Sequence, residues 1–144
     1  MQGTVTDADT SLPVNLAHIY STPGPYATYS GESGDYQMTM MVGTYTVTAE
    51  AFGYYPASAY AVEIITDTVT TQDFTLEPAP TAVISGIVTD EEAGWPLYAS
   101  IEIAGYPYGT IWTDPVSGYY AVTLPQGSPF QFTVSAWVPG YQRS

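Results

Sequence analysis

The segment "SGIVTDEEAGWP" (residues 85–96) is nearly the same as "QGTVTDADTSLP" (residues 2–13), which stands 83 positions earlier. Similarity at a fixed spacing is the sequence signature of a duplicated structural unit. The match continues in the same order along the chain of 144 residues. The further pairs are "LAHIYS" (16–21) with "YASIEI" (98–103), "SGDYQMTMMVG" (33–43) with "SGYYAVTLPQG" (117–127), and "YTVTAEAFGY" (45–54) with "FTVSAWVPGY" (132–141). The sequence therefore predicts two copies of one unit.

Both copies alternate apolar and polar residues with a period of two, which is typical of β-strands with one buried face. Tyr45, Val47 and Ala49 are expected to point to one side of a strand, and the second copy repeats this in "YYAVTL" (119–124). In the first copy we expect strands at about 2–6, 16–21, 26–30, 35–40, 44–51, 59–65 and 71–76. In the second copy we expect them at about 82–89, 98–104, 109–113, 119–124 and 130–137. No window has a helical period.

The residues between the strands predict particular turns. Asp7 and Asp90 each end a strand and are expected to accept backbone N–H groups in Asx-type turns. Gly34 and Gly118 each precede a strand at a position where a positive φ is expected.

The order of these motifs resembles the carboxypeptidase regulatory-like domain. In the second copy the matching residues are Gly86, Val88, Asp90, Pro96, Ile101, Ile103, Thr113, Asp114, Gly118, Tyr120, Leu124, Pro125, Gly127, Val134 and Tyr141. The resemblance implies a transthyretin-like β-sandwich of about seven strands, and its motifs describe a fold more than a function. The expected fold class is therefore all-β, with two tandem Ig/transthyretin-like antiparallel β-sandwich units.

The two copies are not equally long. We expect a first unit at residues 1–78, a Pro-rich linker and strand entry at 79–84, and a second unit at 85–144. The first copy continues into two more strands, and the second is expected to lack the final one or two strands. Two explanations stay open: the sequence is cropped, or a strand from a neighbouring subunit completes the sheet.

The charge balance excludes some classes of partner. The chain has 14 acidic residues, one Arg and no Lys, with a net charge of -13. Such a surface repels nucleic acid and anionic membranes. No run of 18 apolar residues predicts a membrane-spanning helix, and the N-terminus does not resemble a signal peptide. The absence of Cys, the low content of charged residues and the many Thr, Tyr, Gly and Pro favour a secreted or cell-surface protein of a prokaryote.

The sequence also argues against catalysis. His18 is the only histidine, and its place between Ala17 and Ile19 predicts that it faces solvent. Without Cys or Lys, neither a Cys–His pair nor a Schiff base is available. We expect a protein that is not an enzyme, with no catalytic residues and no resident cofactor.

Two sets of residues are candidates for binding. Calcium requires several oxygen ligands, which acidic turns supply. The weak calcium candidates are Asp7, Asp9, Asp90, Glu91 and Glu92. Aromatic side chains in loops stack on sugars or enter partner proteins. The weak aromatic candidates are Tyr54, Tyr55, Trp95, Tyr106 and Tyr108.

We expect a non-catalytic extracellular structural or assembly module, such as a stalk, a spacer or a fibre subunit. Its partners are expected to be other copies of itself or the rest of a longer surface protein, without nucleic acid or membrane insertion. The alternative is an accessory carbohydrate- or protein-binding domain of a secreted hydrolase, which the family resemblance allows.

Overall fold

The structure is a computed structural model in which residues 1–136 are described. The chain divides into two compact units, Met1–Ala79 and Pro80–Ser144, here called unit 1 and unit 2. Trp137 and Tyr141, which belong to the sequence repeat, lie outside the described residues. Among residues 1–136 every regular element is a β-strand, so the expected all-β fold is confirmed.

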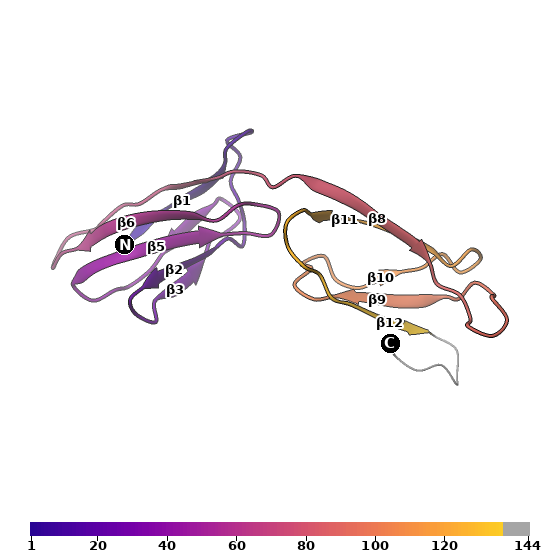
Figure 1. Ribbon diagram of the computed structural model, residues 1–144. Helices are drawn as coiled ribbons and strands as arrows, with labels where there is room; N and C mark the ends of the chain where they lie inside the picture. The colour runs from indigo at the N-terminus through magenta and orange to yellow at the C-terminus, as the bar shows by residue number, and fades with distance from the viewer. Residues whose placement is uncertain (137–144) are drawn as a thin grey trace. The chain divides into compact units, whose positions relative to one another are not determined.

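Unit 1 is a sandwich of two sheets (Figure 1). Its strands are β1 (Gln2–Asp7), β2 (His18–Thr22), β3 (Ala27–Tyr29), β4 (Asp35–Gln37), β5 (Gly43–Glu50), β6 (Ala57–Ile64) and β7 (Phe74–Leu76). One sheet has the order β4-β1-β7, and the other has the order β3-β2-β5-β6. All neighbouring strands are antiparallel except β1 and β7, which run parallel with Val5 opposite Phe74.

Unit 2 repeats the first part of this plan (Figure 1). Its described strands are β8 (Thr81–Ile87), β9 (Ala99–Ile103), β10 (Ile111–Trp112), β11 (Tyr119–Pro125) and β12 (Phe132–Ala136). The strand β11 pairs with β8, and the second sheet has the order β10-β9-β12. By position, β8 to β12 correspond to β1 to β5. Within residues 80–136 no strand corresponds to β6 or β7.

The buried residues follow the expected alternation. Val5, Ile19, Val47 and Leu76 are fully buried in unit 1, where they form one apolar cluster between the sheets. In unit 2 the inward side chains of β9 and β11 are buried in the same manner, namely Ala99, Ile101, Ile103, Val122 and Leu124. Burial of these apolar surfaces is the main contribution to the stability of each sandwich.

The same backbone hydrogen bonds occur in both units. The amide of Val5 donates to Gly34 at 2.9 Å, and the amide of Val88 donates to Gly118 at 3.0 Å. Both glycines have the expected positive φ, 78° for Gly34 and 67° for Gly118. A side chain on either glycine would collide with the carbonyl oxygen of the paired valine. The positive φ and the close approach therefore both require glycine at this corner.

A buried hydroxyl is also repeated. Ser30 Oγ donates to Val14 O at 2.7 Å and accepts from the amide of Ala17 at 2.9 Å. Thr113 is the counterpart of Ser30, and its Oγ1 donates to Leu97 O at 2.7 Å and accepts from the amide of Ala99 at 2.8 Å. Both side chains are 2% exposed. The hydroxyl satisfies two backbone groups that the sheets leave unpaired.

The Pro-rich segment is divided between the units. Within unit 1, Tyr55 N donates to Glu77 O, and Ala79 N donates to Gly53 O. Within unit 2, Gln126 N donates to Pro80 O, and β8 begins with the next residue. Of the segment expected as linker and strand entry (79–84), residues 81–84 belong to strand β8. Searched over the described residues, the chain has no helix of the length and hydropathy needed to cross a membrane.

Candidate functional site

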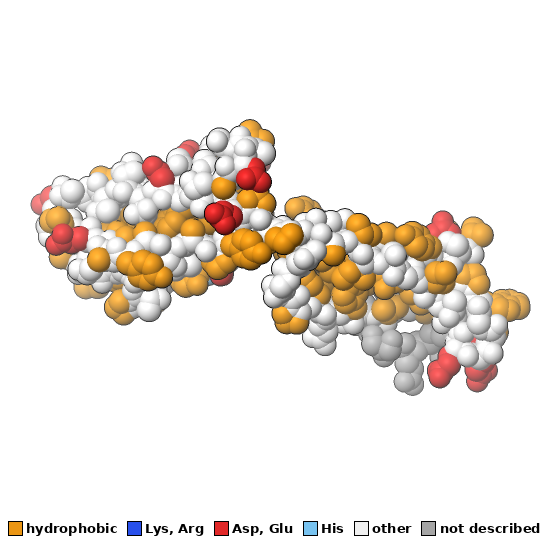
Figure 2. Space-filling model, turned by 45° about the horizontal axis from the view of Figure 1, so that its top comes forward, with side chains coloured by type: hydrophobic (Ala, Val, Ile, Leu, Met, Phe, Trp, Pro, Cys, Tyr) orange, Lys and Arg blue, Asp and Glu red, His pale blue; other side chains and the backbone are white. Residues whose placement is uncertain are grey.

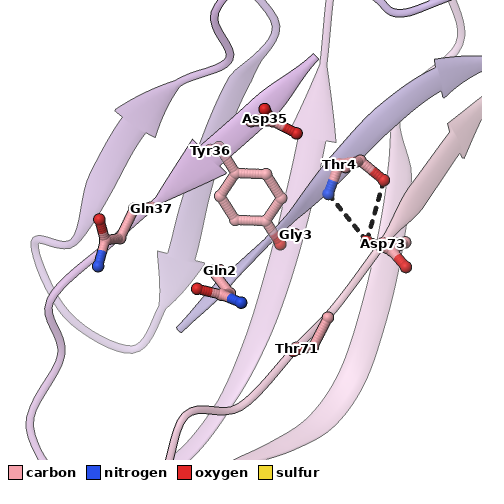
Figure 3. A pocket seen from close by; sticks show the side chains of 8 residues that line it. All are labelled: Gln2, Gly3, Thr4, Asp35, Tyr36, Gln37, Thr71 and Asp73. Atoms are coloured by element: carbon pink, nitrogen blue, oxygen red, sulfur yellow. Dashed lines mark hydrogen bonds between the residues drawn. The ribbon is translucent and has the colours of Figure 1, made fainter. Parts of the chain in front are cut away.

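The strand β1 lies between two other strands of its sheet, and a shallow hollow opens beside it (Figure 3). The residues that line it are Gln2, Gly3, Thr4, Asp35, Tyr36, Gln37, Thr71 and Asp73. They come from β1, from β4 and from the segment that leads into β7. The hollow thus forms where three chain segments meet on the outside of unit 1.

The polar groups of this hollow bond mainly to one another. Asp73 Oδ1 accepts the amide of Thr4 at 2.8 Å and its hydroxyl at 3.0 Å (Figure 3). The Tyr36 hydroxyl donates to Gln72 O at 2.5 Å. Burial, and to a smaller extent the negative charge of Asp73, raise the pKa of Tyr36 well above its usual value. The phenol therefore stays protonated and acts as a hydrogen-bond donor. These contacts fix the approach to β7 against β1.

A close contact explains why β7 fits here. Gly3 lies under the backbone of Gln72, and a Cβ atom on Gly3 would overlap the Gln72 carbonyl group. The Tyr36 ring lies beside the same position, with its Cε1 2.9 Å from where that Cβ would be. Glycine is required at position 3 because it has no side chain, and not because of its conformational freedom.

Unit 2 has the same glycine and the same tyrosine without the strand. Tyr120 pairs with Gly86 across β11 and β8, as Tyr36 pairs with Gly3 across β4 and β1. A Cβ atom on Gly86 would lie 3.0–3.2 Å from the Tyr120 ring and hydroxyl and would meet no backbone group among the nearest atoms. In the part of unit 2 that the structure describes, only β11 pairs with β8. The other edge of β8, here called the β8 edge, is the candidate site.

The calcium candidates lie in turns, and two of them, Asp7 and Asp90, accept hydrogen bonds from the protein itself. Asp7 Oδ1 accepts the amides of Asp9 and Thr10 at 2.9 and 2.7 Å, as an Asx-type turn requires, and Asp7 Oδ2 accepts the Tyr54 hydroxyl at 2.8 Å. The amide of Thr10 and then the hydroxyl of Tyr54 lower the pKa of Asp7. Asp90 accepts the amide of Ala93 in the second unit.

The acidic residues do not gather into a larger cluster. Asp9, Glu91 and Glu92 are exposed in these same turns. Over residues 1–136, no three His, Asp or Glu side chains come together in a way that could hold a metal ion. Calcium binding remains a prediction without a geometric site to support it.

Some of the aromatic candidates pack against neighbouring residues, and others are exposed. Tyr54 is half-buried and bonded to Asp7, so its hydroxyl has a structural role. Trp95 is 73% exposed and Tyr108 is 77% exposed, whereas Tyr55 is 49% exposed. The Tyr106 and Tyr108 rings meet edge to face at 5.3 Å. These residues do not converge on a described pocket.

Two sets of stacked aromatic side chains were not among the candidates predicted from the loops. Tyr98 and Trp112 stack at 5.1 Å in unit 2, each about two fifths exposed. In unit 1 the His18 ring stacks with the rings of Tyr20 and Tyr29, with centroids 5.1 and 5.0 Å away. Alternation along β2 places His18 and Tyr20 on one face, so the sequence held a signal for that pair. The cross-strand partners depend on register, which the sequence does not show.

The side chain of His18 faces outward as predicted. Its side chain is 33% exposed, and its Nδ1 lies 3.3 Å from Glu50 Oε1. Ala17 and Ile19 on either side are fully buried. The contacts of His18 are therefore the rings of Tyr20 and Tyr29 and the carboxylate of Glu50.

Comparisons with known proteins place the chain in one family. Residues 1–77 match the carboxypeptidase regulatory-like domain. Carboxypeptidase D of Anas platyrhynchos is 33% identical over 82 residues, which is 57% of this chain and 6% of that protein. Bacillopeptidase F of Bacillus subtilis (strain 168) is 31% identical over 121 residues, which is 80% of this chain and 8% of that protein. The chain therefore spans less than a tenth of the length of these curated relatives.

Among solved structures, a streptococcal ancillary pilin aligns over 95% of this chain and 52% of its own chain. The sequence identity is 10% and the TM-score is 0.46, a likeness too distant to support a function.

Proposed function

Because the chain belongs to the family of carboxypeptidase regulatory-like domains, we propose that it is a non-catalytic structural module of a secreted or cell-surface protein. Its role is that of a stalk, a spacer or an assembly subunit built from repeated β-sandwiches. Its partners are the rest of a longer surface protein or neighbouring polypeptide chains, and it binds neither nucleic acid nor the membrane interior.

One observation carries this proposal: the two units share their framework and not their polar surface. The glycine corners and the buried hydroxyls of Ser30 and Thr113 are repeated with the same hydrogen bonds. Two chemically versatile side chains are not repeated, since His18 has Ser100 as its counterpart and Asp35 has Tyr119. A duplication that retains only the scaffold supports a mechanical or architectural role over a chemical one.

The size of the match adds support. A segment that spans 6% and 8% of two much longer relatives is a module within larger proteins.

The surface of the chain is also suited to exposure. With a net charge of -13 it is kept soluble by charge repulsion. Figure 2 shows acidic side chains on both units and no Lys or Arg side chain on that face.

The test is a search for turnover together with a measurement of mechanical integrity. The purified chain is incubated with panels of peptide and glycan substrates, and single molecules are stretched by force spectroscopy. We expect no turnover and two separate unfolding events, because each unit has its own core. Turnover that is lost in Asp73→Asn or His18→Gln while the fold is kept would contradict the proposal.

A second candidate function rests on the Tyr98–Trp112 pair. The two rings stack at 5.1 Å and remain partly exposed, which is suited to contact with sugar rings. The alternative is thus an accessory carbohydrate-binding module beside a hydrolase. A glycan array with the chain and its Trp112→Ala variant distinguishes the two functions. The structural role predicts no glycan that depends on Trp112.

A further inference from the structure

The four-stranded sheet of unit 1 carries three stacked rings on its outward face. Cross-strand pairing places His18 on β2 opposite Tyr29 on β3 and opposite Glu50 on β5. Tyr20 lies on the same face of β2, because side chains two positions apart in a strand point the same way. The His18 ring stacks with Tyr29 at 5.0 Å and with Tyr20 at 5.1 Å. These three rings, with Glu50 beside them, are here called the ring platform.

The ring platform faces solvent. Tyr29 is 61% exposed, and the side chains of His18 and Glu50 are 33% and 49% exposed. Ile19 and Ala49 alternate with these residues along β2 and β5 and are fully buried. The core of unit 1 is therefore formed by the opposite face of the sheet. Aromatic surface that stays in water on one face of a sheet is typical of a contact surface.

Unit 2 has a ring pair at the same edge of its sheet. Trp112 on β10 is the counterpart of Tyr29 on β3, since each directly precedes the buried hydroxyl residue of its unit. Trp112 stacks with Tyr98 at 5.1 Å. The second ring comes from a different position in each unit, because the counterpart of Tyr98 is Leu16 and the counterpart of His18 is a serine. A ring pair that is retained although its residues change points to a use of the ring surface beyond the fold.

The polar groups beside the rings are suited to a ligand with hydroxyl groups. His18 Nδ1 lies 3.3 Å from Glu50 Oε1. Because a carboxylate only accepts hydrogen bonds, the neutral form of this imidazole holds its proton at Nδ1 and presents Nε2 as an acceptor. Farther along the same face, the hydroxyls of Thr48 and Ser58 lie 2.8 Å apart. A sugar combines C–H bonds on the faces of its ring, which stack on aromatic rings, with hydroxyl groups around the rim.

The charge of the chain limits which sugars can approach. Residues 1–136 contain all 14 carboxylate side chains and neither Lys nor Arg. Such a surface repels sulfated, phosphorylated and uronic acid polymers, and it does not repel a neutral glycan. The flat face of a sheet favours a flat ligand. An extended chain of β-linked glucose fits this description, because its hydroxyl groups are equatorial and its C–H bonds form both faces of a ribbon.

We propose that the ring platform of unit 1 binds a neutral, extended β-linked glucan. Its sugar rings stack on Tyr29 and Tyr20, and its hydroxyl groups donate to Glu50 and to Nε2 of His18. The inference goes beyond the proposed structural function, since the module then also attaches the protein that carries it to a glycan surface. It shares only the class of ligand with the second candidate function, whose rings lie in unit 2.

The experiment titrates the ¹⁵N-labelled whole chain with cellohexaose, a soluble oligomer of β-linked glucose. We expect saturable shifts of the amide resonances of His18, Tyr29 and Glu50. Tyr29→Ala removes the most exposed ring of the platform and is expected to weaken binding about tenfold. Tyr29→Phe keeps the ring and is expected to bind like the parent. Glu50→Ala removes an acceptor and is expected to weaken binding severalfold.

Matched controls come from the same sheet. Tyr60 on β6 is 78% exposed, and β5 separates its strand from β2. Tyr60→Ala therefore removes a ring of the same size outside the platform. Glu63→Ala, also on β6, is the corresponding control for Glu50→Ala. Both controls are expected to bind like the parent, and circular dichroism verifies that each variant is folded.

Several results overturn the inference. One is a folded chain without saturable shifts, and another is equal weakening by Tyr29→Ala and Tyr60→Ala. Shifts confined to Trp112 and its neighbours would place the glucan in unit 2 and support the second candidate function instead. Rings and carboxylates also attract cations, so tighter binding of a tetra-arginine peptide than of cellohexaose through Tyr29 would make a basic partner the occupant. None of these results involves turnover or unfolding under force, so failure here is separable from failure of the proposed structural function.

Discussion

The backbone of Gln72 passes over Gly3 at a distance that no side chain on residue 3 would permit. This contact positions β7 beside β1 and places Phe74 and Leu76 in the core of unit 1. The counterpart of Gly3 in unit 2 is also a glycine, Gly86, although no described strand passes over it. The difference between these two glycines gives the first prediction.

Gly3→Ala is expected to destabilise unit 1 by about 3 kcal/mol or more, because β7 must move or lose its place. Gly86→Ala is expected to cost within about 1 kcal/mol, since only the Tyr120 ring has to shift slightly. Urea unfolding measures both. All three Trp residues follow position 80, so tryptophan fluorescence reports on unit 2 and circular dichroism on both units. Equal destabilisation by the two substitutions would contradict the account.

We expect that the glycines of the repeated corner do not tolerate substitution in either unit. Gly34→Ala and Gly118→Ala each combine a positive φ with a collision against a valine carbonyl, and we expect losses above about 2 kcal/mol. Gly127→Ala is the control, because its φ of 88° is also positive but its Cβ would meet nothing within 4 Å. It is expected to cost only about 1 kcal/mol in urea unfolding. A Gly127→Ala loss as large as that of Gly118→Ala would show that the carbonyl contact is unimportant.

The buried hydroxyls are expected to stabilise each unit through two backbone groups. Thr113→Val keeps the shape of the side chain and removes its hydrogen bonds to Leu97 and Ala99, at a cost of about 1–3 kcal/mol. Thr113→Ser retains the hydroxyl and is expected to lose less. Ser30→Ala is the equivalent change in unit 1. Thermal unfolding followed by fluorescence measures the Thr113 variants, and identical stability of Thr113→Val and Thr113→Ser would be the contrary result.

Asp7 is expected to link the stability of unit 1 to pH. Its pKa in the folded state lies below the ordinary value of 3.8 because it accepts hydrogen bonds from Thr10 and Tyr54. The stabilisation is therefore fully present above that ordinary value and is lost as the pH falls through the folded pKa. Tyr54→Phe is expected to raise the pKa of Asp7, which ¹³C NMR of the carboxyl group measures directly.

Asp114 is the internal control for this titration. The amide and hydroxyl of Ser117 lower its pKa within unit 2, independently of Tyr54. Its titration is therefore expected to stay unchanged in Tyr54→Phe. A shift of both carboxyl groups would indicate a general effect on the fold instead of a lost hydrogen bond.

The sequence predicted the local structure well because local structure depends on nearby residues. Alternation located the strands, and Gly34 and Gly118 predicted the tight corners. The repeat offset rises from 83 to 84 where the turn from Gly31 to Gly34 becomes the longer turn from Asp114 to Gly118. An added residue in a turn is tolerated because the paired strands on either side keep their register.

The parallel pairing of β1 with β7 could not be predicted in this manner. It joins Val5 to Phe74 across almost the whole of unit 1, and no local pattern shows which edge a distant strand takes. The role of Gly3 was missed for the same reason, since its neighbour Gln72 is remote in sequence. The β8 edge became visible only when the two units were compared in three dimensions.

The most direct test of the account is native-state hydrogen exchange at four amides. The amides of Gln2 and Thr4 donate to Thr70 and Asp73 in unit 1, and Ser85 and Ile87 are their counterparts on the β8 edge. We predict slow exchange at Gln2 and Thr4 and fast exchange at Ser85 and Ile87 in the monomeric chain. Equal protection at all four amides would contradict the claim that unit 2 presents an open strand edge.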